Sequence, residues 1–92
     1  MATQLKKGTF EICLLALLQH KDSYGYELVG ELNQIIEVKE STIYLILQRL
    51  ERSKHLESYV HVIEDTARAR KYYRITDLGK AYYKMLLNEW DN

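Results

Sequence analysis

Arginine, lysine and tyrosine side chains gather in the middle of the chain. Residues 41–76 carry seven Lys and Arg against four Asp and Glu, whereas the 92-residue chain carries thirteen of each and has no net charge. The cations and phenols of this segment are Arg52, Arg68, Arg70, Lys71 and Arg74, with Tyr44, Tyr59, Tyr72 and Tyr73. Such groups donate hydrogen bonds to phosphate oxygens, so the segment suits the backbone of a nucleic acid. An ordinary solvated surface has a similar composition, so the elements that carry these residues must decide.

Other chemistries lack the residues that they need. His55 and His61 are about 20 Å apart on a regular strand, too far to hold one metal ion, and no cysteine pair or acidic cluster completes a site with His20. A nucleophile with its base and a glycine-rich phosphate loop are both missing, so we expect neither an enzyme nor a cofactor.

Cys13 has no second cysteine to pair with. It lies in the apolar run 12–18, which is shorter than the ~18 residues of a membrane span and follows no basic leader. We therefore expect a cytoplasmic protein without a membrane partner.

Hydrophobic periodicity predicts helices and one β-hairpin. The predicted helices span about 9–20, 24–36, 42–52 and 77–92, and the predicted strands 56–63 and 70–75 are joined by a tip at 64–69. The first helix is apolar nearly all round, so neighbours must enclose it. Asp22 or Ser23 is expected to cap the second helix, Ser41 or Thr42 the third, and Thr76 the last.

The third helix has a core face and a polar face. Ile43, Ile46, Leu47 and Leu50 recur at helical spacing and predict the core face. The other face holds Ser41, Thr42, Leu45, Gln48, Arg49 and Arg52. It contains no acidic side chain, and its leucine is not needed by the core pattern, so this face suits DNA better than water.

The strands of the hairpin each have two sides. In the first strand Leu56, Val60 and Val62 share a side, and in the second Tyr73 and Ile75 do. The same alternation places Arg70 and Arg74 with Tyr72 and sends Lys71 to the opposite side.

The last helix has more apolar surface than one core can cover. One stripe consists of Leu78, Ala81, Tyr82 and Met85, and a second of Tyr83, Leu86, Leu87 and Trp90. We expect the first stripe to face the core. The second would stay wet unless another chain covered it, which predicts a homodimer through this helix.

The order helix, helix, helix, hairpin, helix is that of a winged helix-turn-helix. We therefore expect a mainly α fold with a β-hairpin, in which residues 1–76 form the DNA-binding unit and residues 77–92 an added C-terminal dimerisation helix. In this architecture the third helix enters the major groove and the hairpin, or wing, reaches the flanking backbone. The same architecture occurs in modules that bind only protein, so the order of elements leaves function open.

Five motifs follow one another in the order of a known family. They are Lys7-Gly8-Thr9, Tyr24-Gly25-Tyr26-Glu27, Ser41-Thr42-Ile43-Tyr44 with Arg49-Leu50-Glu51, Arg70-Lys71-Tyr72-Tyr73-Arg74-Ile75-Thr76, and Leu78-Gly79. On these motifs the chain resembles the PadR-like transcriptional regulators, and its short C-terminal region resembles their small subfamily. The chain departs from the family pattern at Ser41 and Lys54, where glycine is usual, and at Leu45, where proline is usual. Lys54 is then expected to adopt a left-handed conformation after the third helix.

The resemblance implies a homodimeric repressor that binds a double-stranded DNA operator and is released by a small aromatic or hydrophobic ligand. The predicted DNA-binding residues are Ser41, Thr42, Tyr44, Leu45, Gln48, Arg49, Arg68, Arg70, Lys71 and Arg74. In the family the tyrosine that matches Tyr44 contacts the DNA backbone, and a tryptophan near the position of Trp90 faces a hydrophobic pore. Gln48 can pair with adenine N6 and N7, and Leu45 can contact a thymine methyl group.

Several alternatives stay open. Tyr44 can be half-packed under the wing, and Arg49 can form a salt bridge instead of binding phosphate. Phe10, Tyr83 and Trp90, with Tyr82, can line a ligand cavity at the dimer seam or serve only as dimer packing. The alternative function is a winged-helix module that binds another protein without reading DNA.

Overall fold

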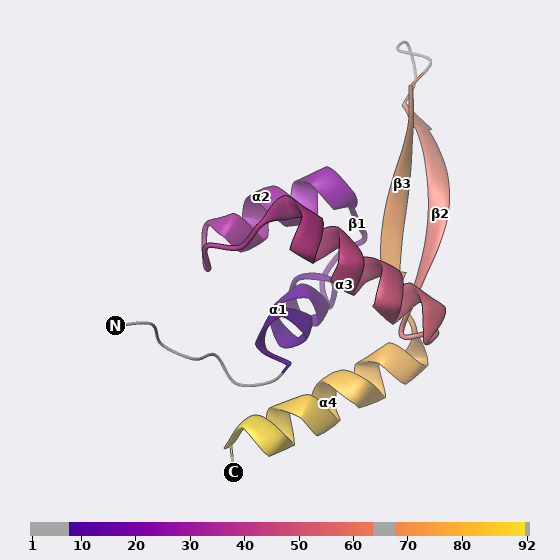
Figure 1. Cartoon of the computed structure of the whole chain (residues 1–92). Helices are drawn as coiled ribbons and strands as arrows, with labels where there is room; N and C mark the ends of the chain where they lie inside the picture. Colours follow the sequence, from indigo (N-terminus) through magenta and orange to yellow (C-terminus); the bar gives the residue numbers. More distant parts are fainter. Residues whose placement is uncertain (1–7, 64–67, 92) are drawn as a thin grey trace.

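The computed structural model describes residues 8–63 and 68–91. Its elements in chain order are α1 (Thr9–Leu17), β1 (Ser23–Tyr24), α2 (Gly25–Asn33), α3 (Glu40–Arg52), β2 (Leu56–Ile63), β3 (Arg68–Ile75) and α4 (Asp77–Asp91). Figure 1 shows α1, α2 and α3 gathered on one side of a long β2–β3 hairpin, with α4 running beneath them. The predicted fold class, mainly α with a β-hairpin wing, is confirmed. Of the predicted hairpin tip, residues 64–67 lie outside the described part of the chain.

A short strand joins the hairpin into a three-stranded antiparallel sheet of order β1-β3-β2. Ser23 lies opposite Tyr73, and Tyr24 opposite Tyr72. Periodicity did not predict β1, because two residues are too few to alternate. The expected cap of α2 by Asp22 or Ser23 is wrong: the N-cap residue is Tyr24, and no side chain caps the helix.

The core is built mainly from leucine and isoleucine of the first three helices. Its fully or nearly fully buried members include Leu14, Leu15, Leu28, Leu32, Ile43, Ile46, Leu47, Leu50, Leu56 and Ile75. The four predicted core residues of α3 are all among them, so its predicted core face is confirmed. The second helix was expected to run to about residue 36, but α2 ends at Asn33, and Ile35 beyond it is 62% exposed.

The start of α3 differs from the prediction, whereas its end agrees with it. The helix begins at Glu40 after the N-cap residue Lys39, which makes no side-chain cap, so the predicted cap by Ser41 or Thr42 is wrong. At the other end Lys54 has φ of 70°, the left-handed conformation expected where the family carries glycine. The backbone N–H of His55 then donates to the Leu50 carbonyl at 2.9 Å, which closes the helix and starts the wing.

The wing extends beyond the helices, and its two faces differ. Opposite residues in the β2–β3 register, from Leu56 opposite Ile75 to Ile63 opposite Arg68, share a face. Val60 and Val62 lie on the same face as buried Leu56, yet they are 66% and 61% exposed. The distal half of the hairpin therefore carries an uncovered apolar face, since no helix reaches that far along it (Figure 1).

The start of α4 is held by local contacts. The Thr76 hydroxyl accepts a hydrogen bond from the Gly79 N–H at 3.0 Å, which confirms the predicted cap. A Cβ at Gly79 would lie 2.1 Å from the carbonyl oxygen of His55. Only a glycine lets the helix lie this close to the turn between α3 and β2.

This close approach also decides which face of α4 is buried. With Gly79 against the turn, the residues one and two turns later, Tyr82 and Leu86, point inward, and Leu86 is 8% exposed. Leu78 and Met85 point outward and are 53% and 48% exposed. Two predictions are therefore corrected: Leu78, Ala81 and Met85 do not face the core, and Leu86 does not belong to the outward stripe.

Candidate nucleic-acid interface

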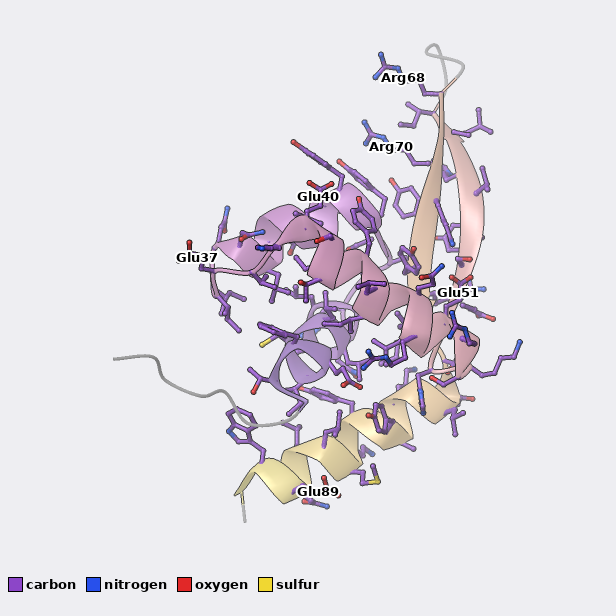
Figure 2. All side chains as sticks on the ribbon, in the orientation of Figure 1. Glu37, Glu40, Glu51, Arg68, Arg70 and Glu89 are labelled. Atoms are coloured by element: carbon purple, nitrogen blue, oxygen red, sulfur yellow. The ribbon has the colours of Figure 1, made fainter. Side chains whose placement is uncertain are left out.

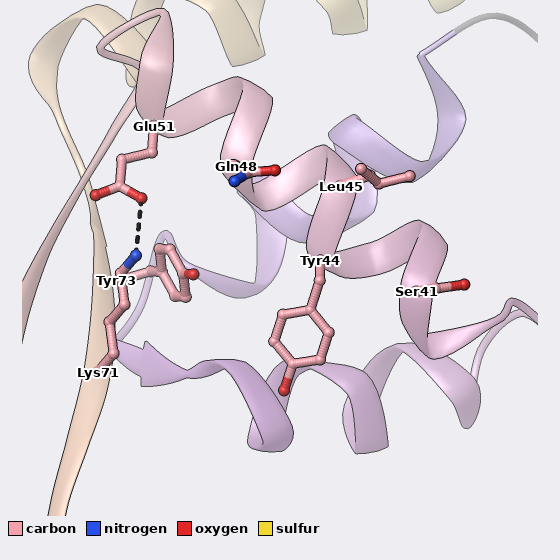
Figure 3. Close-up of a pocket in the computed structure, with 7 residues that line it drawn as sticks. All are labelled: Ser41, Tyr44, Leu45, Gln48, Glu51, Lys71 and Tyr73. Atoms are coloured by element: carbon pink, nitrogen blue, oxygen red, sulfur yellow. Dashed lines mark hydrogen bonds and ion pairs between the residues drawn. The ribbon is translucent and has the colours of Figure 1, made fainter.

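An open groove lies between α3 and the wing (Figure 3). Its volume is about 480 Å³, and it is lined by Ser41, Tyr44, Leu45, Gln48, Glu51, Lys71 and Tyr73. The α3 residues recur at positions one helical turn apart, so they form one stripe, while the last two residues come from β3. Leu45 is 61% exposed, and Ser41 and Gln48 are exposed beside it. The part of the helix that was predicted to suit DNA therefore faces the wing across an accessible groove.

Tyr44 connects this groove to the start of α2. A Cβ at Gly25 would lie 2.6 Å from Cε1 of the Tyr44 ring, so the ring rests directly on the glycine. Partial burial and, to a smaller extent, the charge of Glu40 raise the pKa of the Tyr44 phenol. The ring is 37% exposed. Tyr44 is thus half-packed, as one alternative predicted, but against α2 and with an accessible edge.

A second, smaller hollow of about 210 Å³ extends the groove toward α2. Tyr44, Lys71 and Tyr73 line both hollows, and the second adds Tyr24, Gly25, Tyr26 and Arg70. Phenols and cations from α2, α3 and the wing thus form one surface.

An acidic residue lies at the inner end of the groove. Glu51 Oε1 is 3.1 Å from the Lys71 ammonium, and its Oε2 accepts a hydrogen bond from the Ser58 hydroxyl. The hydrogen bond from Ser58 is the main cause that lowers the pKa of Glu51, and the bond to Glu51 is the main cause that raises the pKa of Lys71. Glu51 was not among the predicted DNA-binding residues. Its position three residues after Gln48, on the same stripe, is the signal that could have placed it there.

We call the face of the wing that carries buried Leu56 its inner face and the opposite face its outer face. The inner face carries Lys71, and the outer face carries Arg70, Tyr72 and Arg74, on opposite sides as predicted. The Arg70 guanidinium lies over the Tyr24 ring at 4.4 Å from its centroid. Figure 2 shows Arg68 and Arg70 toward the far end of the wing and Glu51 near its base. The predicted cations are therefore spread over two faces of the hairpin.

Arg74 is bound within the protein at the base of the outer face. Its Nε is 2.8 Å from Glu57, and its guanidinium lies over the Tyr59 ring. Tyr59 stacks on Tyr72 and donates a hydrogen bond to Asp22 at 2.7 Å. These contacts brace the wing against the loop before α2.

Arg49 is exposed but does not line the groove. It lies on the α4 side of α3, where its charge slightly opposes the rise in the pKa of Tyr82 to about 12. That rise is caused by burial and by the hydrogen bond that Tyr82 donates to Glu11 at 2.8 Å. The structure does not bring Arg49 together with the other predicted DNA-binding residues.

Residues 8–63 and 68–91 contain no group of three or more His, Cys, Asp and Glu side chains placed to hold a metal ion. None of the helices in this part of the chain is long and apolar enough to cross a membrane.

Comparisons with known proteins identify the family. The profile of the transcriptional regulator PadR-like family matches residues 14–85. An uncharacterised protein of Lysinibacillus sphaericus is 42% identical over 88 residues, which cover 91% of this chain and 80% of the relative. The chain belongs to the PadR-like family. The resemblance drawn from its motifs is confirmed, and the PadR-like proteins are transcriptional regulators, not enzymes.

Solved structures of PadR-like proteins share the fold. A PadR family transcription regulator of Clostridium difficile superposes with a TM-score of 0.81 at 34% identity, covering 91% of this chain and 88% of the other. Bacillus subtilis PadR, solved in complex with operator DNA, superposes with a TM-score of 0.72 at 28% identity over 84% of this chain. This chain covers 45% of that longer PadR protein.

Proposed function

We propose that this PadR-like regulator is a sequence-specific, homodimeric repressor that binds a DNA operator and is released by a small aromatic or hydrophobic ligand. The observation that carries the proposal is the groove between α3 and the wing with its extension toward α2, which together combine exposed hydrogen-bonding side chains with Lys71 and Arg70. The complex of Bacillus subtilis PadR with operator DNA supports DNA as the partner.

The arrangement suits two kinds of DNA contact, one to base edges and one to the phosphate backbone. Gln48 and Leu45 lie on the exposed stripe of α3, where they can meet base edges in the major groove. Ser41, Thr42 and the accessible edge of Tyr44 lie at the start of the same helix and suit the backbone. Arg68 and Arg70, far along the wing, are the cations that we assign to phosphates. Arg74 is a weaker candidate because Glu57 already neutralises it.

Two uncovered apolar surfaces support a dimer. Leu78, Ala81 and Met85 form an outward stripe on α4. A hollow of about 390 Å³ lies on the side of α1 away from its buried Leu14 and Leu15. It is lined by residues that include Ile12, Leu17 and the exposed Ile35. A second copy of the chain would cover such surfaces and set two recognition helices ~34 Å apart, one turn of DNA.

Trp90 is the residue that we expect to contact the proposed ligand at the dimer interface. It is 37% exposed near the end of α4, while Phe10 and Tyr83 pack partly against the core. A ligand between the rings of two subunits would release DNA only by favouring a dimer with a different spacing of its recognition helices. We place the protein in the cytoplasm, where such an operator is accessible.

Selection of bound sequences from random duplex DNA, followed by a salt titration, tests the proposal. We expect enrichment of a sequence with two-fold symmetry, and a log affinity that falls linearly with log salt by about 0.9 per phosphate contacted. The alternative, a module that binds only protein, would show no binding to duplex DNA at any salt concentration.

A further inference from the structure

The carboxylate of Glu51 stands in a place where a DNA-binding surface usually avoids negative charge. Among the described residues that line the groove it is the only acidic one, and its side chain is 31% exposed. A carboxylate there repels DNA phosphates, which lowers the affinity for any duplex. We therefore looked for contacts of Glu51 that could offset this loss of affinity.

Glu51 links α3 to both strands of the wing. It lies in the last turn of α3, Ser58 lies on β2, and Lys71 lies on β3. Ser58 and Lys71 both lie on the inner face of the wing, two register positions apart. The lysine ammonium donates to one carboxylate oxygen (Figure 3). The serine hydroxyl donates to the other, so the carboxylate has a fixed orientation.

Lys71 is correspondingly held in the groove. Its ammonium bonds to Glu51 at 3.1 Å and lies 5.2 Å from the centroid of the Tyr73 ring, although the side chain is 52% exposed. Arg70, next to it in sequence, instead stacks on the neutral ring of Tyr24. Of these two neighbouring cations, Lys71 is therefore the one that a carboxylate keeps from reaching toward a phosphate.

We propose that Glu51 is a positioning residue for specificity: it holds the Lys71 ammonium over the groove and withholds it from backbone phosphates. Random DNA is then bound with one phosphate contact fewer, while the Lys71 ammonium, held over the groove, can still donate to acceptor atoms of the operator's base edges. The inference rests on the proposed function, since it concerns how that function discriminates between sequences.

Glu51→Gln tests this role with little change in shape. Glutamine keeps an oxygen that accepts the Ser58 hydrogen bond but loses the charge that holds Lys71. On random duplex DNA we expect higher affinity at low salt and a salt slope steeper by about 0.9, equivalent to an additional loss of about 3.5-fold between 50 and 200 mM salt. The ratio of operator to random affinity should fall.

Three further variants separate this role from a general charge effect. Lys71→Gln alone should leave the slope on random DNA unchanged, and Glu51→Gln with Lys71→Gln should restore the slope of the unmodified protein. Glu40→Gln removes the same charge at the exposed start of α3, so any rise in affinity that it causes should be independent of Lys71. Thermal unfolding of each variant shows that it is folded.

Two results would overturn the inference. One is a slope that falls by about 0.9 in Lys71→Gln, because Lys71 would then already bind phosphate. The other is an effect of Glu51→Gln that persists when Lys71 is also replaced. A protein that binds no duplex DNA before any substitution would instead contradict the proposed function, so the two failures are distinguishable.

Discussion

At the scale of single residues, base reading and phosphate binding should respond differently to substitution. Gln48→Ala should cost about 1–3 kcal/mol on the preferred operator and little on random DNA, because it removes hydrogen bonds to one base. Arg70→Ala should weaken binding to every duplex and flatten the salt slope by about one unit. Fluorescence anisotropy with operator and random duplexes measures both effects. Equal losses on the two duplexes for Gln48→Ala would contradict base reading.

Tyr82 gives the stability of the protein a dependence on alkaline pH. Its pKa is raised from 10.0 to about 12 in the folded chain by burial and by its hydrogen bond to Glu11. The stabilisation is therefore fully present below pH 10 and is lost as the pH rises toward 12, because the unfolded chain ionises first. The midpoint of thermal unfolding should fall less between pH 9 and pH 11.5 in Tyr82→Phe than in the unmodified protein. Parallel curves would rule out this linkage, and Tyr26→Phe, on an exposed side chain, is the matched control.

At the scale of elements, the contact between α4 and the turn before the wing should be sensitive to a single methyl group. In Gly79→Ala the new Cβ would meet the backbone carbonyl of His55, which cannot move aside as a side chain can. We expect a loss of at least about 2 kcal/mol in the free energy of unfolding, measured with urea at one chain concentration. Gly30→Ala, in the middle of α2 with open space around it, should instead gain about 0.5–1 kcal/mol. Similar effects of the two substitutions would show that the close approach does not constrain α4.

At the scale of the whole molecule, the outward stripe of α4 should hold two chains together. Met85→Glu places a charge on an apolar side chain that is 48% exposed, so it should dissociate the dimer while leaving each chain folded. Sedimentation equilibrium at micromolar concentration measures the change. Lys80→Glu, on the polar side of the same helix, should leave the dimer intact. An unmodified protein that sediments as a monomer would refute the proposed assembly.

The proposed release by a ligand would also be a property of the assembled molecule. A planar aromatic compound bound at the dimer seam should quench the fluorescence of Trp90, which is the single tryptophan of the chain. A screen of planar dyes and phenolic acids, run on protein shown to be dimeric, measures this. If no compound changed the fluorescence, Trp90 would be a packing residue and the regulator would act without a ligand.

Local pattern was enough to determine several features of the chain. The spacing of Ile43, Ile46, Leu47 and Leu50 determined the core face of α3, because a helix repeats its faces whatever surrounds it. The Thr76 cap was likewise predictable, since it depends on residues close by in sequence. The left-handed Lys54 was predicted from the family resemblance, because glycine is usual at that position. The motifs were enough to identify the family.

Contacts between residues far apart in sequence decided the rest. Strand β1 exists only because β3 lies beside it, and the buried face of α4 follows from the approach of Gly79 to His55. Helical spacing alone could not decide this face, because the apolar residues of α4 nearly surround it. The same is true of the charges: the register of the wing divides its cations between two faces and brings Lys71 to Glu51. The sequence by itself therefore determined which residue types are present for binding DNA, and the tertiary structure decided which of them share a surface, because a shared surface depends on the relative placement of separate elements.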